Sequence, residues 1–570
     1  MMAAIKQNDA NSVYRSWLNY EKLDEETRKE LEAISDQPKE IEDRFYKELE
    51  FGTGGLRGVI GAGTNRMNLY TVGRATQGLA QYILEKGANG PLAVIAYDSR
   101  HKSPEFALET ALVLAGNGIT AYVFETLRPT PELSFAVREL KASAGVVITA
   151  SHNPPEYNGY KVYGPDGGQL VPEAAGQVTE YISRVTSFDQ VRRLSREEAE
   201  AKGLLRWIGA EIDRKYTDAV VSVSPNRTLL EKAADDLHII YTPLHGAGNM
   251  PVREALRRMG FRKVEIVAEQ EHPDPQFSTV KSPNPEEREA FTLALQMARQ
   301  SNADIVIGTD PDCDRMGAVV RDEQGSYHIL TGNQAGALLV HYLLSSLKER
   351  NQLPANGAVV KTIVTSEMGA EIARSYGMHT FDTLTGFKYI GQKISEFEAS
   401  GAYRFLFGYE ESYGYLAGTY CRDKDAVVAS VLICEAAAYY KMQGKTLLDV
   451  LEDLYRQYGY FQERLESLTM KGKEGLEQIR RIMEDWRNNP PATVAGMKVV
   501  QAEDYLNGLY GLPKENVLKY KLEDRSWFCL RPSGTEPKLK IYFGVCGTSG
   551  EEAAGRLQRL ADEVLANVRK

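Results

Sequence analysis

Residues 146–161 read VVITASHNPPEYNGYK. An apolar segment, which we predict to be a buried strand, runs directly into Ser151 and His152 and then into a turn rich in Pro, Asn and Gly. A serine at a strand end can present its hydroxyl to a substrate, and activated serines form covalent intermediates, including with phosphoryl groups. The same residue types also dominate ordinary surface turns, so this segment alone leaves both interpretations open.

The segments around this strand alternate between two patterns. Strand-like stretches lie at 92–97, 121–124 and 145–150, and helix-like stretches lie at 70–87, 104–116 and 131–139. This alternation predicts a mostly parallel sheet with helices on both faces. Residues 12–50 are expected to form N-terminal helices, and FGTGGLRG (51–58) is expected to be a glycine-rich loop. The charged stretch 190–236 is expected to separate the first α/β unit from the second.

The pattern recurs twice, at 237–310 and at 333–440, and changes beyond about residue 460. We therefore predict an α/β fold with three similar α/β domains, whose sheets are mixed and mostly parallel, and a smaller C-terminal α+β domain. The predicted domains are 1–212, 213–325, 326–455 and 456–570.

Composition narrows the function classes. The chain has 570 residues, of which 43% are hydrophobic and 26% charged, as in an ordinary globular protein. Its net charge of -10 argues against a nucleic-acid-binding protein, because such proteins usually carry an excess of basic residues. Its five cysteines are odd in number and widely spaced, which argues for a reducing compartment. The sequence contains no run of 18 apolar residues and no apolar leader. We expect a cytoplasmic protein without a membrane or nucleic-acid partner.

The acidic loop GTDPDCDR (308–315) follows an apolar strand and brings together Asp310, Asp312 and Asp314. Three carboxylates on one loop repel one another unless a cation lies among them, and hard oxygen ligands suit Mg²⁺ or Ca²⁺. An EF-hand fails because Arg315 and Arg321 stand where Gly and Glu are required. A haloacid-dehalogenase-type Asp-x-Asp loop normally continues to Thr or Val, whereas Asp314 stands at that position. A solvated acidic turn is the remaining alternative for this segment.

Two further loops carry polar chemistry. The clamp loop RPSGTEPK (531–538) combines cationic, hydroxyl and glycine residues, which suits a phosphate, although an ordinary hairpin turn is also plausible. The sugar loop FGYEESYGY (407–415) places Glu410, Glu411 and Ser412 among Tyr409, Tyr413 and Tyr415. Carboxylates accept hydrogen bonds from hydroxyls and aromatic rings pack on sugars, so this loop suits a polyhydroxylated ligand better than a solvated turn.

Taken together, these loops resemble the signature loops of the α-D-phosphohexomutase superfamily, the phosphoglucomutase/phosphomannomutase enzymes. They occur in the family's order, from FGTGGLRG to RPSGTEPK. The resemblance implies four domains around one central cleft, each contributing one loop. It also implies a phosphosugar substrate, Mg²⁺ as cofactor and glucose 1,6-bisphosphate as activator. We expect a monomer or weak dimer.

The resemblance also assigns roles to individual residues. Ser151 matches the serine that carries the phosphoryl group, and His152 is its neighbour. The metal ligands would be Asp310, Asp312 and Asp314 with an oxygen of phosphorylated Ser151. Arg57 and Lys161 match cations near the transferring group, and Lys161 is the candidate general acid/base. Substrate-binding positions would be Arg315, Thr385, Gly386, Lys388, Glu410, Ser412 and Lys424, and the phosphate clamp would be Arg531, Ser533, Gly534 and Thr535.

Two departures bear on the sugar. The common glucose signature is GEES, whereas Tyr409 intervenes here to give GYEES, and the mannose-type GEMSGH is absent. GYEES and TLTGFK are similar to a branch of bacterial α-phosphoglucomutases that also includes phosphopentomutases and a glucose-1,6-bisphosphate synthase. We predict an α-phosphoglucomutase that interconverts glucose 1-phosphate and glucose 6-phosphate. The competing functions are those of a phosphopentomutase or phosphomannomutase, a sugar-phosphate phosphatase and a non-catalytic phosphosugar-binding protein.

Overall fold

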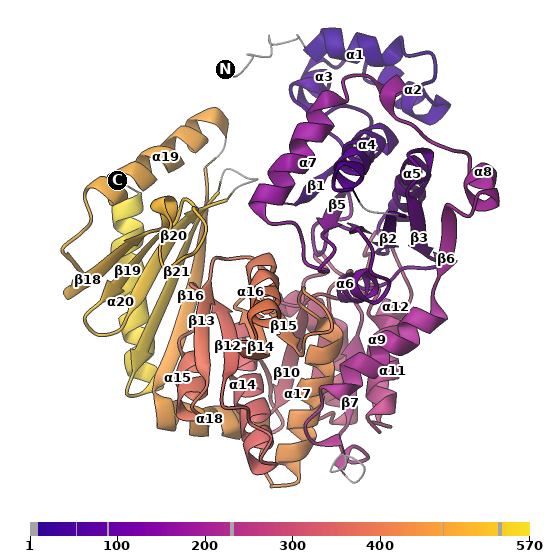
Figure 1. Cartoon of the computed structure of the whole chain (residues 1–570). Coiled ribbons are helices and arrows are strands. Elements are labelled where there is room, and N and C mark those ends of the chain that lie inside the picture. Colours follow the sequence, from indigo (N-terminus) through magenta and orange to yellow (C-terminus); the bar gives the residue numbers. More distant parts are fainter. Residues whose placement is uncertain are drawn as a thin grey trace.

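The computed structural model describes residues 10–52, 54–87, 90–227, 233–470, 472–533 and 538–569. Their strands form four sheets that follow one another along the chain, and Figure 1 shows the four units along an arc, with the C-terminal unit at the left. None of the helices in these residues is long and apolar enough to cross a membrane. The predicted four-unit α/β architecture is confirmed.

Three short helices precede the first sheet, as predicted: α1 (Ala10–Leu18), α2 (Glu25–Glu32) and α3 (Pro38–Phe45). Their apolar faces meet around Trp17, whose ring centroid lies 5.7 Å from that of Phe45 and 5.4 Å from that of Tyr70 on α4 (Leu69–Glu85). Both contacts are edge-on, an arrangement that aromatic quadrupoles favour. The helices are thereby packed onto the first α/β unit.

The first sheet has the strand order β1-β5-β4-β2-β3-β6. The parallel strands β4, β2, β3 and β6 are extended at one edge by the antiparallel strands β5 and β1. The strands are β1 (Gly55–Val59), β2 (Leu92–Tyr97), β3 (Thr120–Phe124), β4 (Ala144–Ile148), β5 (Tyr157–Tyr163) and β6 (Leu205–Ile208). The further helices are α5 (Ser103–Gly116), α6 (Thr130–Glu139), α7 (Pro172–Arg184), η1 (Phe188–Gln190), α8 (Arg196–Ala201) and α9 (Ala210–Ser222).

Two segments of this unit differ from the prediction. The stretch FGTGGLRG is not loop throughout, because Gly55–Val59 pairs with β5 as an antiparallel strand. Gly55 permits this close approach, since a Cβ there would lie 2.2 Å from the carbonyl oxygen of Tyr160. The charged stretch 190–236 is likewise more than a separator, because it contains the edge strand β6, whose Arg206 and Trp207 are exposed. Exposed edge strands commonly carry charged residues.

The second and third sheets have the orders β11-β10-β9-β7-β8 and β13-β12-β14-β15, with both parallel and antiparallel pairs. The second unit contains β7 (Ile239–Thr242), β8 (Val264–Ile266), β9 (Ile305–Thr309), β10 (Met316–Arg321), β11 (Tyr327–Ile329), α11 (Asn249–Arg258), α12 (Ala268–Glu271), η2 (Arg288–Phe291) and α13 (Thr292–Ser301). The third contains β12 (Gly357–Thr362), β13 (His379–Thr383), β14 (Arg404–Glu410), β15 (Gly414–Ala417), α14 (Gly332–Glu349), α15 (Met368–Ser375), α16 (Phe387–Ser400), α17 (Ala426–Lys441) and α18 (Leu447–Tyr458).

The fourth sheet is antiparallel throughout, in the order β16-β21-β20-β19-β18-β17, as expected for a separate α+β unit. It contains β16 (Tyr460–Thr469), β17 (Thr493–Val494), β18 (Met497–Asp504), β19 (Leu518–Leu522), β20 (Trp527–Pro532), β21 (Lys538–Gly547), α19 (Gly472–Asn488), η3 (Tyr505–Asn507) and α20 (Gly550–Val568). The domain borders stay predictions; the one proposed at 325/326 divides the β10–β11 hairpin.

Buried apolar residues continue from one unit into the next. One core joins the second and third sheets and reaches the first unit through Phe135 and Tyr216. A smaller core joins the third and fourth units, where Leu384, after β13, belongs to the same buried cluster as Trp527 of β20. Burying apolar surface is the main favourable term in folding, so these shared cores hold the functional loops of different units together.

Candidate active site

Ser151 lies three residues after the end of β4 and is buried, with 4% of its surface exposed. Its backbone has a φ of 52°, in the left-handed region, a conformation that costs a non-glycine residue on the order of 1–3 kcal/mol. The Ser151 N–H donates to Thr149 Oγ1 at 2.8 Å. Strained backbone of this kind clusters at functional sites when surrounding contacts enforce it.

The Ser151 hydroxyl connects the first unit to the second. Its Oγ donates to Asp310 Oδ2 at 2.7 Å, across 159 residues of sequence, and lies 3.1 Å from His152 Nδ1. The acidic loop that supplies Asp310 is the turn of the β9–β10 hairpin, in which Thr309 pairs with Met316. The structure thus brings the two strongest sequence motifs into direct contact.

The three aspartates of the acidic loop form a candidate metal centre. Asp310, Asp312 and Asp314 each offer a carboxylate oxygen within 4.8 Å of the others, and all three residues are buried. Asp312 Oδ1 and Asp314 Oδ1 are buried without a hydrogen-bond partner among the described residues. Buried polar atoms normally have a partner, so these unpartnered oxygens fit a site for a hard cation such as Mg²⁺.

Two lysines partly neutralise these carboxylates. Lys161 Nζ lies 2.8 Å from Asp312 Oδ2 and 3.5 Å from Asp314 Oδ2, and Lys424 Nζ lies 2.8 Å from Asp314 Oδ2. Burial and the two neighbouring aspartates raise the pKa of Asp310 well above its usual range. Burial also opposes ionisation of Asp312, but Lys161 and Lys424 hold the pKa of that carboxyl below its usual value.

Lys161 itself is held in the charged form. Burial would lower the pKa of the Lys161 ammonium, but Asp312 and Asp314 raise it above its ordinary value. His152 is affected in the opposite direction, because burial, followed by Arg315 and Arg57, lowers the pKa of its imidazole well below the usual range. Arg57 is exposed on β1, and its Nη1 donates to Asn153 Oδ1 at 3.3 Å. This part of the site therefore holds a protonated lysine and a neutral histidine.

The third unit supplies the predicted sugar-reading residues. The Gly386 N–H donates to Glu410 Oε1 at 2.8 Å, which joins the TLTG stretch to the sugar loop. Burial, followed by the neighbouring Glu411, raises the pKa of Glu410 to about 7, and burial lowers the pKa of Lys388 to about 8. Thr385 Oγ1 is buried without a hydrogen-bond partner among the described residues. Perturbed pKa values at one place are typical of functional sites.

Two tyrosines of the sugar loop, Tyr409 and Tyr415, do not face this site as predicted. Tyr409 is fully buried, and its ring lies against the backbone of Gly336 and Gly369 on α14 and α15. Successive residues of a strand point to opposite faces of the sheet, so Tyr409 faces the helices while Glu410 faces the other side. Tyr415 is also 1% exposed within the same core. The expectation that the aromatic rings of this loop pack on a sugar is wrong for Tyr409 and Tyr415.

Arg315 joins the acidic loop to the sugar loop. Its Nη1 donates to the Ser412 carbonyl oxygen at 2.9 Å, and its backbone forms an isolated bridge with Gly414. The same guanidinium is paired with Glu286 at 2.5 Å. Glu286 was not predicted, because it lies in an ordinary polar stretch whose sequence does not show that it reaches Arg315.

The clamp loop begins at the end of β20. Arg531 Nε donates to Glu515 Oε1 at 3.1 Å, and Lys540 on β21 is the cross-strand partner of Arg531. Glu515 and Arg531 both act electrostatically on the pKa of Lys388, so charges of the fourth unit reach the third. Ser533 donates its N–H to the carbonyl oxygen of Lys538 at 2.8 Å. Gly534 and Thr535 lie outside the described residues.

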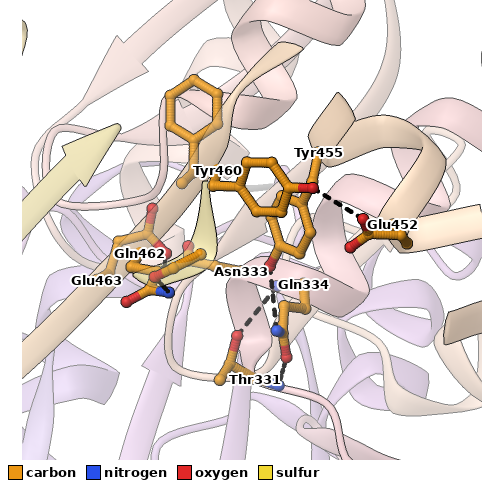
Figure 2. Close-up of a pocket in the computed structure, with 10 residues that line it drawn as sticks. Thr331, Asn333, Gln334, Glu452, Tyr455, Tyr460, Gln462 and Glu463 are labelled. Atoms are coloured by element: carbon orange, nitrogen blue, oxygen red, sulfur yellow. Dashed lines mark hydrogen bonds between the residues drawn. The ribbon is translucent and has the colours of Figure 1, made fainter. Parts of the chain in front are cut away.

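A separate cavity of about 430 Å³ lies at the junction of the third and fourth units (Figure 2). Tyr455 and Tyr460 stack there with ring centroids 5.3 Å apart, and Tyr460 donates to Glu452 at 2.8 Å. Its lining comes from α14, α18, β16 and the start of α20, and it includes none of the predicted site residues. This cavity is therefore distinct from the candidate active site, which is built from charged loops.

Comparison with known proteins agrees with the fold and the motifs. In four consecutive blocks the sequence matches phosphoglucomutase/phosphomannomutase alpha/beta/alpha domain I at 48–188, domain II at 214–325, domain III at 331–458 and the C-terminal domain at 468–565. A phosphoglucomutase of Staphylococcus haemolyticus is 40% identical over 515 residues, covering 88% of this chain and 91% of the relative. A phosphoglucomutase of Staphylococcus aureus is 39% identical over 540 residues, covering 92% and 95%.

Solved structures share the fold at lower identity. A Paramecium phosphoglucomutase, pp63/parafusin in an open form, superposes with a TM-score of 0.69 at 16% identity, covering 92% of this chain and 96% of that one. A phosphoglucomutase/phosphomannomutase family protein from Burkholderia thailandensis gives a TM-score of 0.66 at 18% identity, covering 91% and 97%. With all four family domains matched in order, the chain belongs to the phosphoglucomutase/phosphomannomutase family of the α-D-phosphohexomutase superfamily.

Proposed function

We propose that this protein is an α-phosphoglucomutase, which interconverts glucose 1-phosphate and glucose 6-phosphate through a phosphoserine enzyme and a glucose 1,6-bisphosphate intermediate. The observation that carries the proposal is the contact between the Ser151 hydroxyl and Asp310 at the edge of the buried aspartate cluster. A serine hydroxyl beside a candidate cation site is the arrangement that phosphoryl transfer through a phosphoserine needs, and it supports the proposal. The name carried by relatives at about 40% identity supports glucose as the sugar.

The proposed cycle begins with phosphorylated Ser151. The free hydroxyl of the hexose monophosphate forms a new bond to phosphorus while the bond from phosphorus to Ser151 Oγ breaks, giving the bisphosphate. The bisphosphate then reorients, and its other phosphoryl group returns to Ser151. Because the protein has little covalent chemistry to perform in phosphoryl transfer, alignment and charge neutralisation supply most of the catalysis.

We assign the charges of the site to these needs. Asp310, Asp312 and Asp314 would hold Mg²⁺, which supplies neutralisation of the charge on the transferring phosphoryl oxygens. Lys161, whose ammonium stays protonated between Asp312 and Asp314, is the proposed general acid/base. Arg57 would add positive charge on the exposed side of the site.

The remaining predicted residues would hold the sugar and its distal phosphate. Glu410 would accept hydrogen bonds from sugar hydroxyls, and Ser412 would exchange hydrogen bonds with them. The other proposed substrate-binding residues are Thr385, Gly386, Lys388, Lys424 and Arg315. Arg531, Ser533, Gly534 and Thr535 would bind the phosphate that is not being transferred, since a guanidinium fork binds phosphate bidentately. The clamp must accept either end of the sugar, because the bisphosphate binds in both orientations.

The decisive experiment compares kcat/KM on glucose, mannose and ribose 1-phosphates, with glucose 1,6-bisphosphate supplied as activator and inorganic phosphate followed in parallel. We expect glucose 1-phosphate to be preferred. A site built around hydroxyls rejects the wrong epimer because buried polar groups lose their partners. A preference for ribose or mannose would favour the phosphopentomutase or phosphomannomutase, and stoichiometric phosphate release would favour the phosphatase.

Two properties of the proposed enzyme follow from the sequence. Its five cysteines are all free in the structure, in line with an enzyme of the cytoplasm. We propose that it works as a monomer or weak dimer on small phosphosugars, without a nucleic-acid or membrane partner. Size-exclusion chromatography with light scattering tests the oligomeric state.

A further inference from the structure

Arg100 lies behind the nucleophile loop, defined here as residues 149–157. It follows β2, at the carboxyl end of a strand adjacent to β4, and its side chain is completely buried. Its two terminal nitrogens donate to four backbone carbonyl oxygens of this one loop: Ser151 at 2.6 Å, Pro154 at 2.8 Å, Tyr157 at 3.1 Å, and Asn153. One guanidinium thus holds the loop at four points.

Asp98, two residues before Arg100, holds the other side of Ser151. Its Oδ2 accepts from Thr149 Oγ1 at 2.6 Å, and Thr149 Oγ1 in turn accepts the Ser151 N–H at 2.8 Å. Its Oδ1 accepts hydrogen bonds from the backbone N–H of Arg100 at 2.9 Å and from Ser103 Oγ at 2.9 Å. The N–H of Ser151 is therefore fixed through Thr149 and Asp98, and its carbonyl oxygen is fixed by Arg100.

Arg100 also touches the unit that carries the acidic loop. The guanidinium lies 5.0 Å from the ring centroid of Phe277, which is 1% exposed and lies in the segment after α12. A cation above an aromatic face is attracted by the ring quadrupole, and more so when it is desolvated. This contact bridges the same two units as the hydrogen bond from Ser151 to Asp310.

We propose that Arg100 is a positioning residue for phosphoryl transfer. It keeps Ser151 in its left-handed conformation, with φ at 52°, so that Oγ is directed at Asp310. The inference deepens the proposed function and rests on it. An arginine is required because its planar, forked donors reach several carbonyls at once, whereas the ammonium of a lysine is a compact point charge on a flexible stem.

The test replaces Arg100 by Lys, which keeps the charge and removes the fork. We expect kcat to fall by at least about tenfold while KM for glucose 1-phosphate stays within about twofold, because the substrate-binding loops are unchanged. Amide hydrogen exchange in residues 149–157 should become faster in the folded protein. A loss of stability alone would move the melting temperature without this split between kcat and KM.

Arg44→Lys is the matched control. Arg44 lies on α3 with its side chain 15% exposed, and it donates to the Ala62 carbonyl oxygen at 3.2 Å and pairs with Glu40 at 2.8 Å, away from the nucleophile loop. This variant should lower the melting temperature and leave both kcat and the exchange of 149–157 unchanged. Should Arg100→Lys retain wild-type kcat and wild-type exchange in 149–157, the proposal is overturned.

Phe277→Leu covers the case in which Arg100→Lys does not fold. It removes the ring above Arg100 and keeps an apolar side chain, so we expect a few-fold lower kcat and faster exchange in 149–157. Unchanged values for both would contradict the proposal. A wild-type protein without mutase activity would refute the proposed function, while the exchange measurements would still decide whether Arg100 holds the nucleophile loop.

Discussion

The two halves of the candidate site are built differently. At the junction of the first and second units, Ser151 and the three aspartates are at most 4% exposed and are tied to one another by short hydrogen bonds and lysine pairs. At the junction of the third and fourth units, Arg531 and Glu515 are 23% and 26% exposed, and the clamp loop is held to its own domain by their pair.

This difference matches two different tasks. In the proposed cycle the phosphoryl group is always transferred at the same oxygen, so the groups around Ser151 would benefit from being fixed before substrate arrives. The proposed phosphate clamp would have to accept the substrate in two orientations. A more open arrangement, in which phosphate can replace Glu515 as the partner of Arg531, would suit that task. Changes in the first half should therefore affect kcat, and changes in the second half should affect KM.

Loss of the proposed nucleophile is the largest effect that we expect. Ser151→Ala removes the only hydroxyl bonded to Asp310 among the described residues, so mutase activity should fall by several orders of magnitude. Peptide mapping by mass spectrometry of the wild-type protein should find a phosphorylated fraction at Ser151. Ser183→Ala, at an exposed serine of α7, should be fully active. Near-wild-type turnover of Ser151→Ala would refute the assignment of Ser151 as the phosphoryl carrier.

Asp312→Asn should have an effect almost as large. It removes a carboxylate from the metal centre, so activity should drop by orders of magnitude. Mg²⁺ should raise the melting temperature of the wild-type protein, because a ligand that binds the folded state stabilises it, and this shift should disappear in the variant. Asp562→Asn, on the exposed face of α20, is the control. Full activity after thorough chelation would show that no metal is needed.

Arg531→Ala probes the open half. Loss of charge-assisted hydrogen bonds to phosphate costs about 1.5–3 kcal/mol, so KM for glucose 1-phosphate should rise by roughly one to two orders of magnitude. The phosphorylated fraction at Ser151 should persist. Arg480→Ala, an exposed arginine of the same domain on α19, should leave KM unchanged. If KM stays the same in Arg531→Ala, the distal phosphate is bound elsewhere.

The pH profile should report the two titrating groups of the sugar site. Glu410 has a pKa of about 7 and Lys388 one of about 8. If the ionised Glu410 and the protonated Lys388 bind substrate, kcat/KM of the free enzyme rises through pH 7 and falls above pH 8. Lys388→Arg keeps the charge at high pH, so the alkaline limb should shift upward by at least about one unit. An unchanged alkaline limb would exclude Lys388 as its source.

The smallest predicted effect concerns stability. The pKa of Glu410 is raised in the folded state from its usual value of 4.5 to about 7. Keeping Glu410 protonated in the fold therefore stabilises the protein fully below pH 4.5, and this stabilisation, about 3 kcal/mol, is lost as the pH rises through 7. Glu410→Gln should melt like the wild type at pH 5 and above it at pH 8, while glucose turnover falls. Equal melting temperatures at pH 8 would contradict this linkage.

Much of the site could be predicted because its residues stand in short motifs at strand ends. Ser151, the three aspartates and Arg531 each follow or close a strand in the structure, and the carboxyl ends of such strands are where α/β proteins bind ligands. The prediction for Tyr409 was wrong, although side chains of successive strand residues point to opposite faces of a sheet, which could have shown that Tyr409 faces away from Glu410. Glu286 and Glu515 could not be identified, since no local pattern marks a side chain that pairs with an arginine of another segment.

The sequence by itself determined three α/β units and a final α+β unit, their order and the chemistry of the loops between their strands, because hydrophobic periodicity and turn residues act over a few neighbouring positions. Only the tertiary structure decided which groups meet. Ser151 is hydrogen-bonded to Asp310, 159 residues further along the chain, and Lys424 pairs with Asp314 of another unit. Arg100 is hydrogen-bonded to the backbone of Ser151, 51 residues further along the chain. Such contacts depend on how separately folded units pack, and packing complementarity is a property of whole surfaces that no local stretch of sequence encodes.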